Sequence, residues 1–176
     1  MSRILVLGIG NVLMGDDALG SHVIQELEAR YDFPDEVSLI DAGTPGVDLT
    51  AYMAGHDVLL VVDVVRAEGR PGEFRHYDKA KLLEKAPVVA MSPHEPGLRE
   101  ALLTADFMGV APAEVKLIGV IPEVVDLGVR LSEAVRSALP RVLEEVVAEL
   151  AARGAAPAPR DPPGKPDLWW ETPRGM

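Results

Sequence analysis

The chain has 176 residues, with 17 Lys and Arg against 28 Asp and Glu, and it contains no cysteine. This length fits one domain, and the formal net charge of −11 makes nucleic acid and anionic membrane surfaces poor partners. The lack of cysteine excludes disulfide scaffolds, thiolate metal sites and cysteine nucleophiles.

The sequence shows neither a membrane-spanning segment nor a signal peptide. The longest apolar runs, such as Val58–Val65, are far shorter than the ~20 residues that a spanning helix needs. Arg3 leads directly into the apolar run Ile4–Leu7, without the cleavage pattern of a signal peptide. We therefore expect a cytoplasmic monomer that binds neither nucleic acid nor membrane.

Short β-rich runs alternate with helical patterns along the chain. Val58–Val62 is apolar on both faces, which is typical of a central strand covered by helices on both sides. The predicted strands are Ile4–Leu7, Val37–Ile40, Val58–Val62, Gly72–Tyr77 as an edge strand, Val88–Met91 and Val115–Ile121. The predicted helices are Leu19–Leu27, Val47–Met53, Leu98–Phe107 and a final helix that Ser132 caps and that reaches Leu150, with a bend or restart at Pro140.

This alternation predicts an α/β fold with a doubly wound, mostly parallel open sheet of about five strands and helices on both faces. The predicted domain spans residues 1–153. Six of the 15 prolines fall in residues 154–176, so this segment is predicted to be a Pro-rich tail. We expect a disordered extension there. The alternative is an aromatic docking segment around Leu168-Trp169-Trp170 that packs back on the domain or contacts the protein on which the chain acts.

Polar residues gather where the predicted strands end, which is the edge at which such sheets bind ligands. They are Asn11, Asp16, Asp17, Asp41, Asp63, Ser92, His94, Glu95 and Glu123. Two carboxylates 4 Å apart repel each other by roughly 4 kcal/mol at an effective dielectric constant of about 20, so a bound divalent metal would explain the cluster. Two carboxylates and an imidazole suit zinc, nickel, manganese or iron.

Structural roles stay open for several of these residues. Asp16 or Asp17 can cap the first helix, and Asp41 can be a turn residue. His94 follows a proline in a loop, where a histidine is often exposed. The position of Asp63 favours a functional role over a structural one, because Asp is depleted in strands and this residue follows an apolar run. The remaining histidines are predicted to be structural or exposed: His22, His56 and His76.

The glycines after the first strand match a dinucleotide-binding loop poorly. Gly8 and Gly10 are present, but the third glycine of that motif would fall at Leu13, and Asp16 and Asp17 would repel a pyrophosphate. The signatures of nucleoside triphosphatases, zinc proteases and serine hydrolases are absent from the sequence.

A phosphoacceptor receiver domain is a closer alternative, with Asp63 as the phosphorylated residue. Receivers place their acidic pair directly after the first strand, whereas seven residues separate Gly8 from Asp16 here. They also need a lysine after the last strand, where this chain has Ile121-Pro122-Glu123. A non-catalytic metal-binding or nucleotide-binding module with the same fold is a further alternative.

Five segments taken together resemble the hydrogenase maturation proteases, the endopeptidases that trim the large subunit of nickel–iron hydrogenases. The first segment is Gly8–Gly20, which includes Gly-Asn-Val-Leu-Met-Gly-Asp-Asp. The others are Asp41–Gly46, Val62-Asp63, Ser92–His94 and Gly119–Glu123. They occur in the family's order and with similar spacing, over about residues 1–154.

The resemblance implies an endopeptidase that removes a C-terminal extension from the nickel-loaded precursor of the hydrogenase large subunit. It implies that the nickel is supplied by this precursor and that the enzyme has no permanently bound cofactor. The positions that match the family's metal-contacting residues are Asp17, where the family often has Glu, Asp63 and His94. Asp41 matches a further acid, so the implied catalytic set is Asp17, Asp41, Asp63 and His94. Nickel would polarise the scissile carbonyl or activate a water, with Asp17 or Asp41 as general base.

Overall fold

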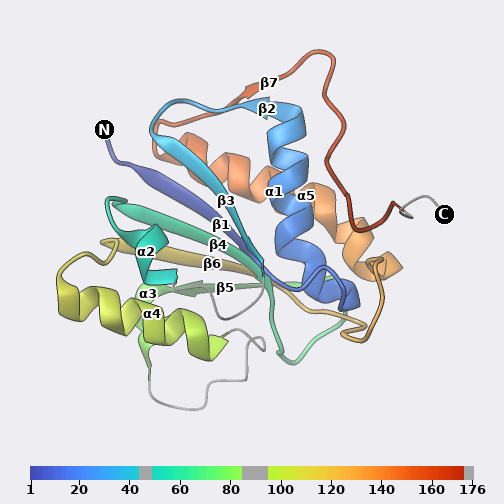
Figure 1. Ribbon diagram of the computed structural model, residues 1–176, viewed down its shortest axis with the longest axis horizontal. Helices are drawn as coiled ribbons and strands as arrows, with labels where there is room; N and C mark the ends of the chain where they lie inside the picture. Colours follow the sequence, from blue (N-terminus) through green and yellow to red (C-terminus); the bar gives the residue numbers. More distant parts are fainter. Residues whose placement is uncertain (44–48, 85–94, 173–176) are drawn as a thin grey trace.

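A five-stranded sheet in the order β3-β1-β4-β6-β5 forms the centre of the fold in the computed structural model, which describes residues 1–43, 49–84 and 95–172 (Figure 1). The first four strands in this order are parallel, and β5 is antiparallel to β6. The strands are β1 (Ile4–Ile9), β3 (Val37–Gly43), β4 (Val58–Val64), β5 (Phe74–Asp78) and β6 (Glu114–Val120). The predicted fold class is therefore confirmed, including the edge strand, while the predicted strand Val88–Met91 lies outside the described residues.

Helices cover both faces of this sheet, as predicted. On one face lie α1 (Leu19–Arg30) and α5 (Glu133–Ala152), and α1 is preceded by the short 3-10 helix η1 (Gly15–Ala18). On the other face lie α2 (Leu49–Met53), α3 (Lys79–Leu83) and α4 (Glu95–Met108). The long helix α5 is capped by Ser132, whose Oγ accepts a hydrogen bond from the Val135 amide, and it continues through Pro140 without a restart.

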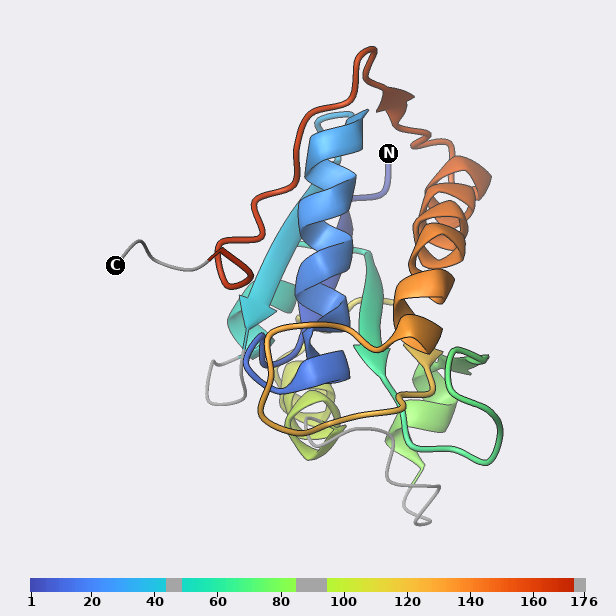
Figure 2. The same cartoon turned by 90° about the vertical axis from the view of Figure 1, so that its right-hand side faces the viewer.

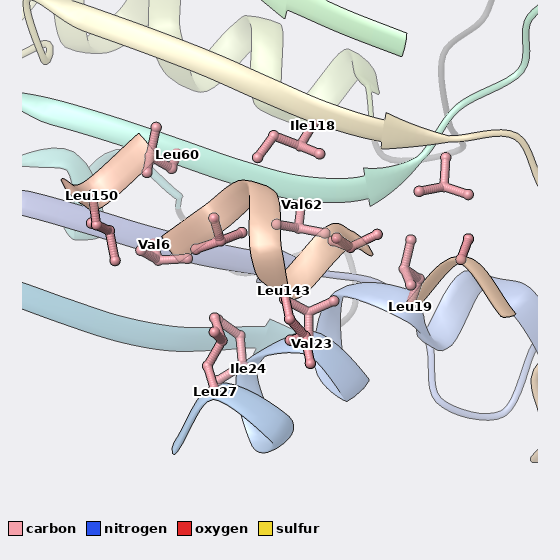
Figure 3. Close-up of a cluster of buried hydrophobic side chains, with 14 of the residues drawn as sticks. Val6, Leu19, Val23, Ile24, Leu27, Leu60, Val62, Ile118, Leu143 and Leu150 are labelled. Atoms are coloured by element: carbon pink, nitrogen blue, oxygen red, sulfur yellow. The ribbon is translucent and has the colours of Figure 1, made fainter. Parts of the chain in front are cut away.

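The two cores follow from the alternation of side chains along the central strands. Leu60, Val62 and Ile118 pack against α1 and α5 in one cluster (Figure 3). Leu59 and Val61 point to the opposite face and pack with residues of α2 and α4. Full burial of a leucine side chain stabilises the fold by about 2 kcal/mol. Because helices cover both faces of the sheet, the apolar side chains on both sides of these strands are buried.

The glycines near the first strand allow α1 to approach β1 closely. A Cβ on Gly20 would lie 2.4 Å from the carbonyl oxygen of Ile9, and a Cβ on Gly8 would lie 2.4 Å from that of Gly20. Both distances are too short for any side chain, so these glycines serve helix–strand packing. This contact fixes where α1, and the loop before it, meets the carboxyl ends of the strands.

Residues 154–172 pack back along α1 (Figure 2). A short strand, β7 (Ala158–Pro159), pairs antiparallel with β2 (Tyr31–Asp32), and the amide of Gly164 donates to the carbonyl of Ala29 at 2.7 Å. The expectation of a disordered extension is wrong for this described part, because α1 supplies backbone acceptors and apolar surface that the Pro-rich composition does not reveal. The alternative prediction, a segment that packs back on the domain, is confirmed.

None of the helices within the described ranges is long and apolar enough to cross a membrane.

Candidate functional site

Three of the predicted acidic residues come from elements that meet at one edge of the sheet. Gly8 of β1 pairs with Asp41 of β3 on one side and with Val62 of β4 on the other, and Asp63 follows Val62. Strands two apart in a sheet are separated by roughly 10 Å, so Asp41 and Asp63 flank the end of β1. The carboxyl ends of β1, β3 and β4 therefore form the floor of the candidate site, as the sequence predicts.

Asp17 lies in η1, directly above this floor. Its side chain is 3% exposed, and its Oδ2 accepts a hydrogen bond from the Asn11 amide at 3.0 Å. Gly10 has φ +151°, and a Cβ there would lie 1.8 Å from the carbonyl oxygen of Asp17, so only glycine permits this close turn. Because η1 also contacts β4, the loop places Asp17 beside the strand that bears Asp63.

Asp63 is a buried carboxylate inside an otherwise apolar strand. It is 4% exposed, and its Oδ1 accepts a hydrogen bond from the amide of Val64 at 2.8 Å. Since Val62 and Val64 pack toward α1 and α5, Asp63 points toward the opposite face, where α4 lies. His94 immediately precedes α4 in the sequence and lies outside the described residues, so its role as a metal contact stays a prediction.

Asp41 is the exposed acid of the site. Its Oδ1 accepts hydrogen bonds from the Ser21 hydroxyl at 2.8 Å and from the Gly43 amide at 3.1 Å. Beside it is a cavity of about 390 Å³, which falls within the usual range for ligand pockets. Its lining includes Asn11, Leu13, Ser21, Asp41 and Trp169. Ser21 was not predicted as a site residue, and the signal available for it was its position one helical turn after Asp17. Trp169 was predicted only as part of the alternative docking segment.

Asp16 differs from its neighbour Asp17, because its carboxylate is saturated by hydrogen bonds from the loop after β6. It is fully buried, and its Oδ2 accepts from the amides of Glu123 and Val124, both at 2.9 Å, and from the Ser132 hydroxyl at 2.8 Å. Its Oδ1 accepts from the Ser132 amide at 2.7 Å. Asp16 thus caps neither η1 nor α1, and its carboxylate connects the loop before α1 to the loop before α5.

The other three histidines have partners other than these acids. His56 Nδ1 is 3.0 Å from the carbonyl of Tyr52, and exposed His76 contacts Glu145. His22 on α1 is 2% exposed and packs edge-on against Trp170, with ring centroids 5.1 Å apart. Burial, and after it the positive charge of Arg136, lowers the pKa of His22 to about 4. The ring is therefore neutral at pH 7, although the Glu171 carboxylate lies 3.6 Å from its Nε2.

This buried ring predicts acid sensitivity of the fold. Unfolded His22 has a pKa near 6.5 and the folded residue one of about 4, so between these values the unfolded state binds more protons. The contribution of neutral His22 to the free energy of unfolding is fully present above pH 6.5. It is lost as the pH drops from 6.5 to 4, by up to about 3 kcal/mol. Urea unfolding of wild type and His22→Gln at several pH values measures this; His76→Gln is the control. An unchanged pH slope in His22→Gln contradicts the assignment.

Among residues 1–43, 49–84 and 95–172, no group of three or more His, Cys, Asp or Glu side chains is arranged to hold a metal ion. The predicted ligand set includes His94, which is outside these ranges, so the set stays a prediction. The described residues supply two buried carboxylates, Asp17 on η1 and Asp63 on β4, and these two elements are in contact. Their oxygen donors are of a type that divalent transition metals accept.

Comparison with known proteins places this chain in a family. The family model described as hydrogenase maturation protease matches residues 21–149 of the chain. The hydrogenase 2 maturation protease of Escherichia coli strain K12 is 36% identical over 165 residues, which cover 90% of this chain and 97% of that protein. The chain belongs to the hydrogenase maturation protease family. The resemblance inferred from five short motifs is therefore confirmed over most of the sequence.

Solved structures of family members share the fold. The hydrogenase maturating endopeptidase HybD from E. coli superimposes with a TM-score of 0.81 at 35% identity, covering 91% of this chain and 99% of that one. The NiFe hydrogenase maturation protease HybD from Thermococcus kodakarensis gives a TM-score of 0.68 at 26% identity, covering 85% and 99%. The predicted activity is thus confirmed: this hydrogenase maturation protease is an endopeptidase. Neither a receiver domain nor a non-catalytic binding module is supported by these comparisons.

Proposed function

We propose that this hydrogenase maturation protease cuts a C-terminal extension from a large-subunit precursor only after nickel has been inserted, and that it contacts this nickel through Asp17, Asp63 and His94. The nickel belongs to the substrate, and the protease needs no metal of its own. Family membership supports the reaction class. The observation that most supports the residue assignment is the burial of Asp17 and Asp63 on adjoining elements at the ligand-binding edge of the sheet.

Burial makes these two carboxylates suited to recognise a cation. A buried carboxylate is costly to remove from water, and an approaching divalent ion recovers part of that cost in a low-dielectric site. Asp17 is held in place by the Asn11 amide, so its orientation does not depend on the substrate. A precursor without nickel would present no such charge, which gives a physical basis for discriminating between the two forms.

Asp41 is the better placed of the two candidate general bases. It is exposed and borders the cavity, whereas Asp17 is 3% exposed. Ser21 and Gly43 donate to its Oδ1, which fixes the plane of the carboxylate. In peptide hydrolysis it would accept a proton from the attacking water and return it to the leaving amine. The nickel of the precursor supplies Lewis-acid stabilisation of the scissile carbonyl oxygen.

Replacing His94 by alanine tests the proposed contact with nickel. We expect His94→Ala to raise the precursor concentration needed for half-maximal processing by roughly tenfold or more, the typical cost of losing one ligand interaction of about 1.4 kcal/mol. Processing is measured as the fraction of nickel-loaded precursor shortened over time. His56→Ala, a histidine remote from the acids, is the control. Unchanged kinetics of His94→Ala would remove this residue from the set of nickel contacts.

A further inference from the structure

The C-terminal segment reaches the candidate active site. After running along α1, it places Trp169 in the lining of the cavity that also contains Asp41 and Ser21. Residues from the far end of the sequence therefore complete a pocket whose other walls come from residues 10–13, 21 and 41–43. Neither the family's catalytic positions nor the motifs in the first two-thirds of the chain include this segment.

The segment is fastened to the domain by the residues on either side of Trp169. Upstream, Gly164 donates to Ala29, as described above. Downstream, Trp170 is 6% exposed and packs edge-on against the buried ring of His22. Glu171 Oε1 then lies 3.6 Å from His22 Nε2 and 3.8 Å from a guanidinium nitrogen of Arg136 on α5. These contacts with two helices fix the position of the neighbouring indole.

Trp169 itself is 55% exposed, although it is held edge-on against Trp170 with ring centroids 5.7 Å apart. A large aromatic ring that is fixed in position and only partly covered presents apolar area to a ligand at little entropic cost. The free face of the indole adjoins the cavity beside Asp41. Trp169 therefore forms part of the pocket wall, and Trp170 anchors the segment to α1 by packing against His22.

The cavity has a second exposed apolar residue in its lining. Leu13, 50% exposed, lines the same cavity, and its carbonyl accepts a hydrogen bond from the Gly128 amide. The neighbours of Gly128, Leu127 and Val129, are exposed as well. Exposed apolar side chains beside a catalytic edge are typical of a site that binds another polypeptide. Because the cavity also contains Asp41, the proposed general base, its occupant is the substrate peptide.

We propose that Trp169 is a substrate-binding residue, which packs against an apolar side chain of the precursor peptide next to the scissile bond, and that Trp170 and Glu171 hold it in that position. This proposal rests on the proposed function, because the occupant of the pocket is the precursor of that reaction. Trp169 determines how tightly the peptide is bound; the chemistry of cleavage stays with the acids. Loss of the indole therefore raises KM and leaves kcat nearly unchanged.

The kinetic test uses the full-length protein and a nickel-loaded precursor. Trp169→Ala is expected to raise KM about tenfold with kcat within about twofold, and Trp169→Phe, which keeps an aromatic face, restores most of the affinity. Phe107→Ala is the matched control, because Phe107 is 93% exposed on α4, across the sheet. Unchanged kcat/KM in Trp169→Ala overturns the proposal, and so does a higher rate, which would make the segment an inhibitory strap.

A fluorescence measurement gives a second readout, since Trp169 and Trp170 are the only tryptophans in the chain. In Trp170→Phe, emission reports on Trp169 alone. Addition of a Trp-free peptide that spans the cleavage junction of the precursor is expected to shift this emission to the blue, as the indole leaves water. An unchanged spectrum at peptide concentrations that compete with processing contradicts the contact. Failure of the wild type to cleave any loaded precursor would instead refute the proposed function.

Discussion

Replacing Asp63 by asparagine is expected to abolish processing while the fold stays intact. The substitution keeps the size of the side chain and an oxygen that can accept from the Val64 amide, so the free energy of unfolding should change by no more than about 1 kcal/mol. It removes the negative charge that the proposed nickel contact requires. We expect the processing rate to fall by at least about 10³-fold, or about 4 kcal/mol, measured by the mass of the large subunit over time.

Asp57, next to the other end of the strand that bears Asp63, offers a matched control. It immediately precedes β4, at the opposite end from Asp63, and its Oδ2 accepts from the Arg3 amide at 2.8 Å. Asp57→Asn changes the net charge by the same amount but leaves the candidate site untouched, so it should process precursor at the wild-type rate. Normal processing by Asp63→Asn would remove Asp63 from the site.

Replacing Asp16 by asparagine is expected to destabilise the protein strongly. The carboxylate accepts four hydrogen bonds, and an amide group in its place would turn an NH₂ toward one of the donors. Mispairing of buried donors costs about 3 kcal/mol, which for a chain of this size lowers Tm by roughly 6–12 °C. The melting temperature is measured by calorimetry or circular dichroism.

Asp126 serves as the comparison for Asp16, because it is exposed in the same loop that Asp16 fastens. Asp126→Asn should melt within about 1 °C of the wild type. Asp16→Asn should also lose processing activity below its melting temperature, since the loop before α5 is one of the supports of the segment that presents Asp17. A melting temperature equal to that of the wild type would show that the four hydrogen bonds add no net stability.

Much of the fold follows from local patterns. The apolar run at residues 4–7 predicts a buried strand, and the run at residues 58–62 predicts a strand covered on both faces. The two strands pair with each other inside the sheet, with the two cores around them. The cap at Ser132 was predictable from its residue type. Asp63 could be singled out as a candidate site residue, because Asp is depleted in strands and this one follows an apolar run; its role stays a prediction.

Other features depend on contacts that no local pattern records. Asp16 and Asp17 are adjacent and chemically identical, yet one is saturated by amides more than 100 residues away and the other faces the candidate site. Trp169 reaches the cavity only because the segment before it follows α1. In both cases the partner surface is assembled by the tertiary fold, so spacing along the sequence could not assign the role.

Cleavage of matched precursors with and without nickel tests whether the protease recognises the metal. The full-length protease is incubated with each form of a hydrogenase large-subunit precursor, and the products are weighed by mass spectrometry. The proposed recognition of nickel by Asp17, Asp63 and His94 predicts loss of a C-terminal peptide from the loaded form only. Cleavage of both forms at equal rates, or of neither, would contradict it.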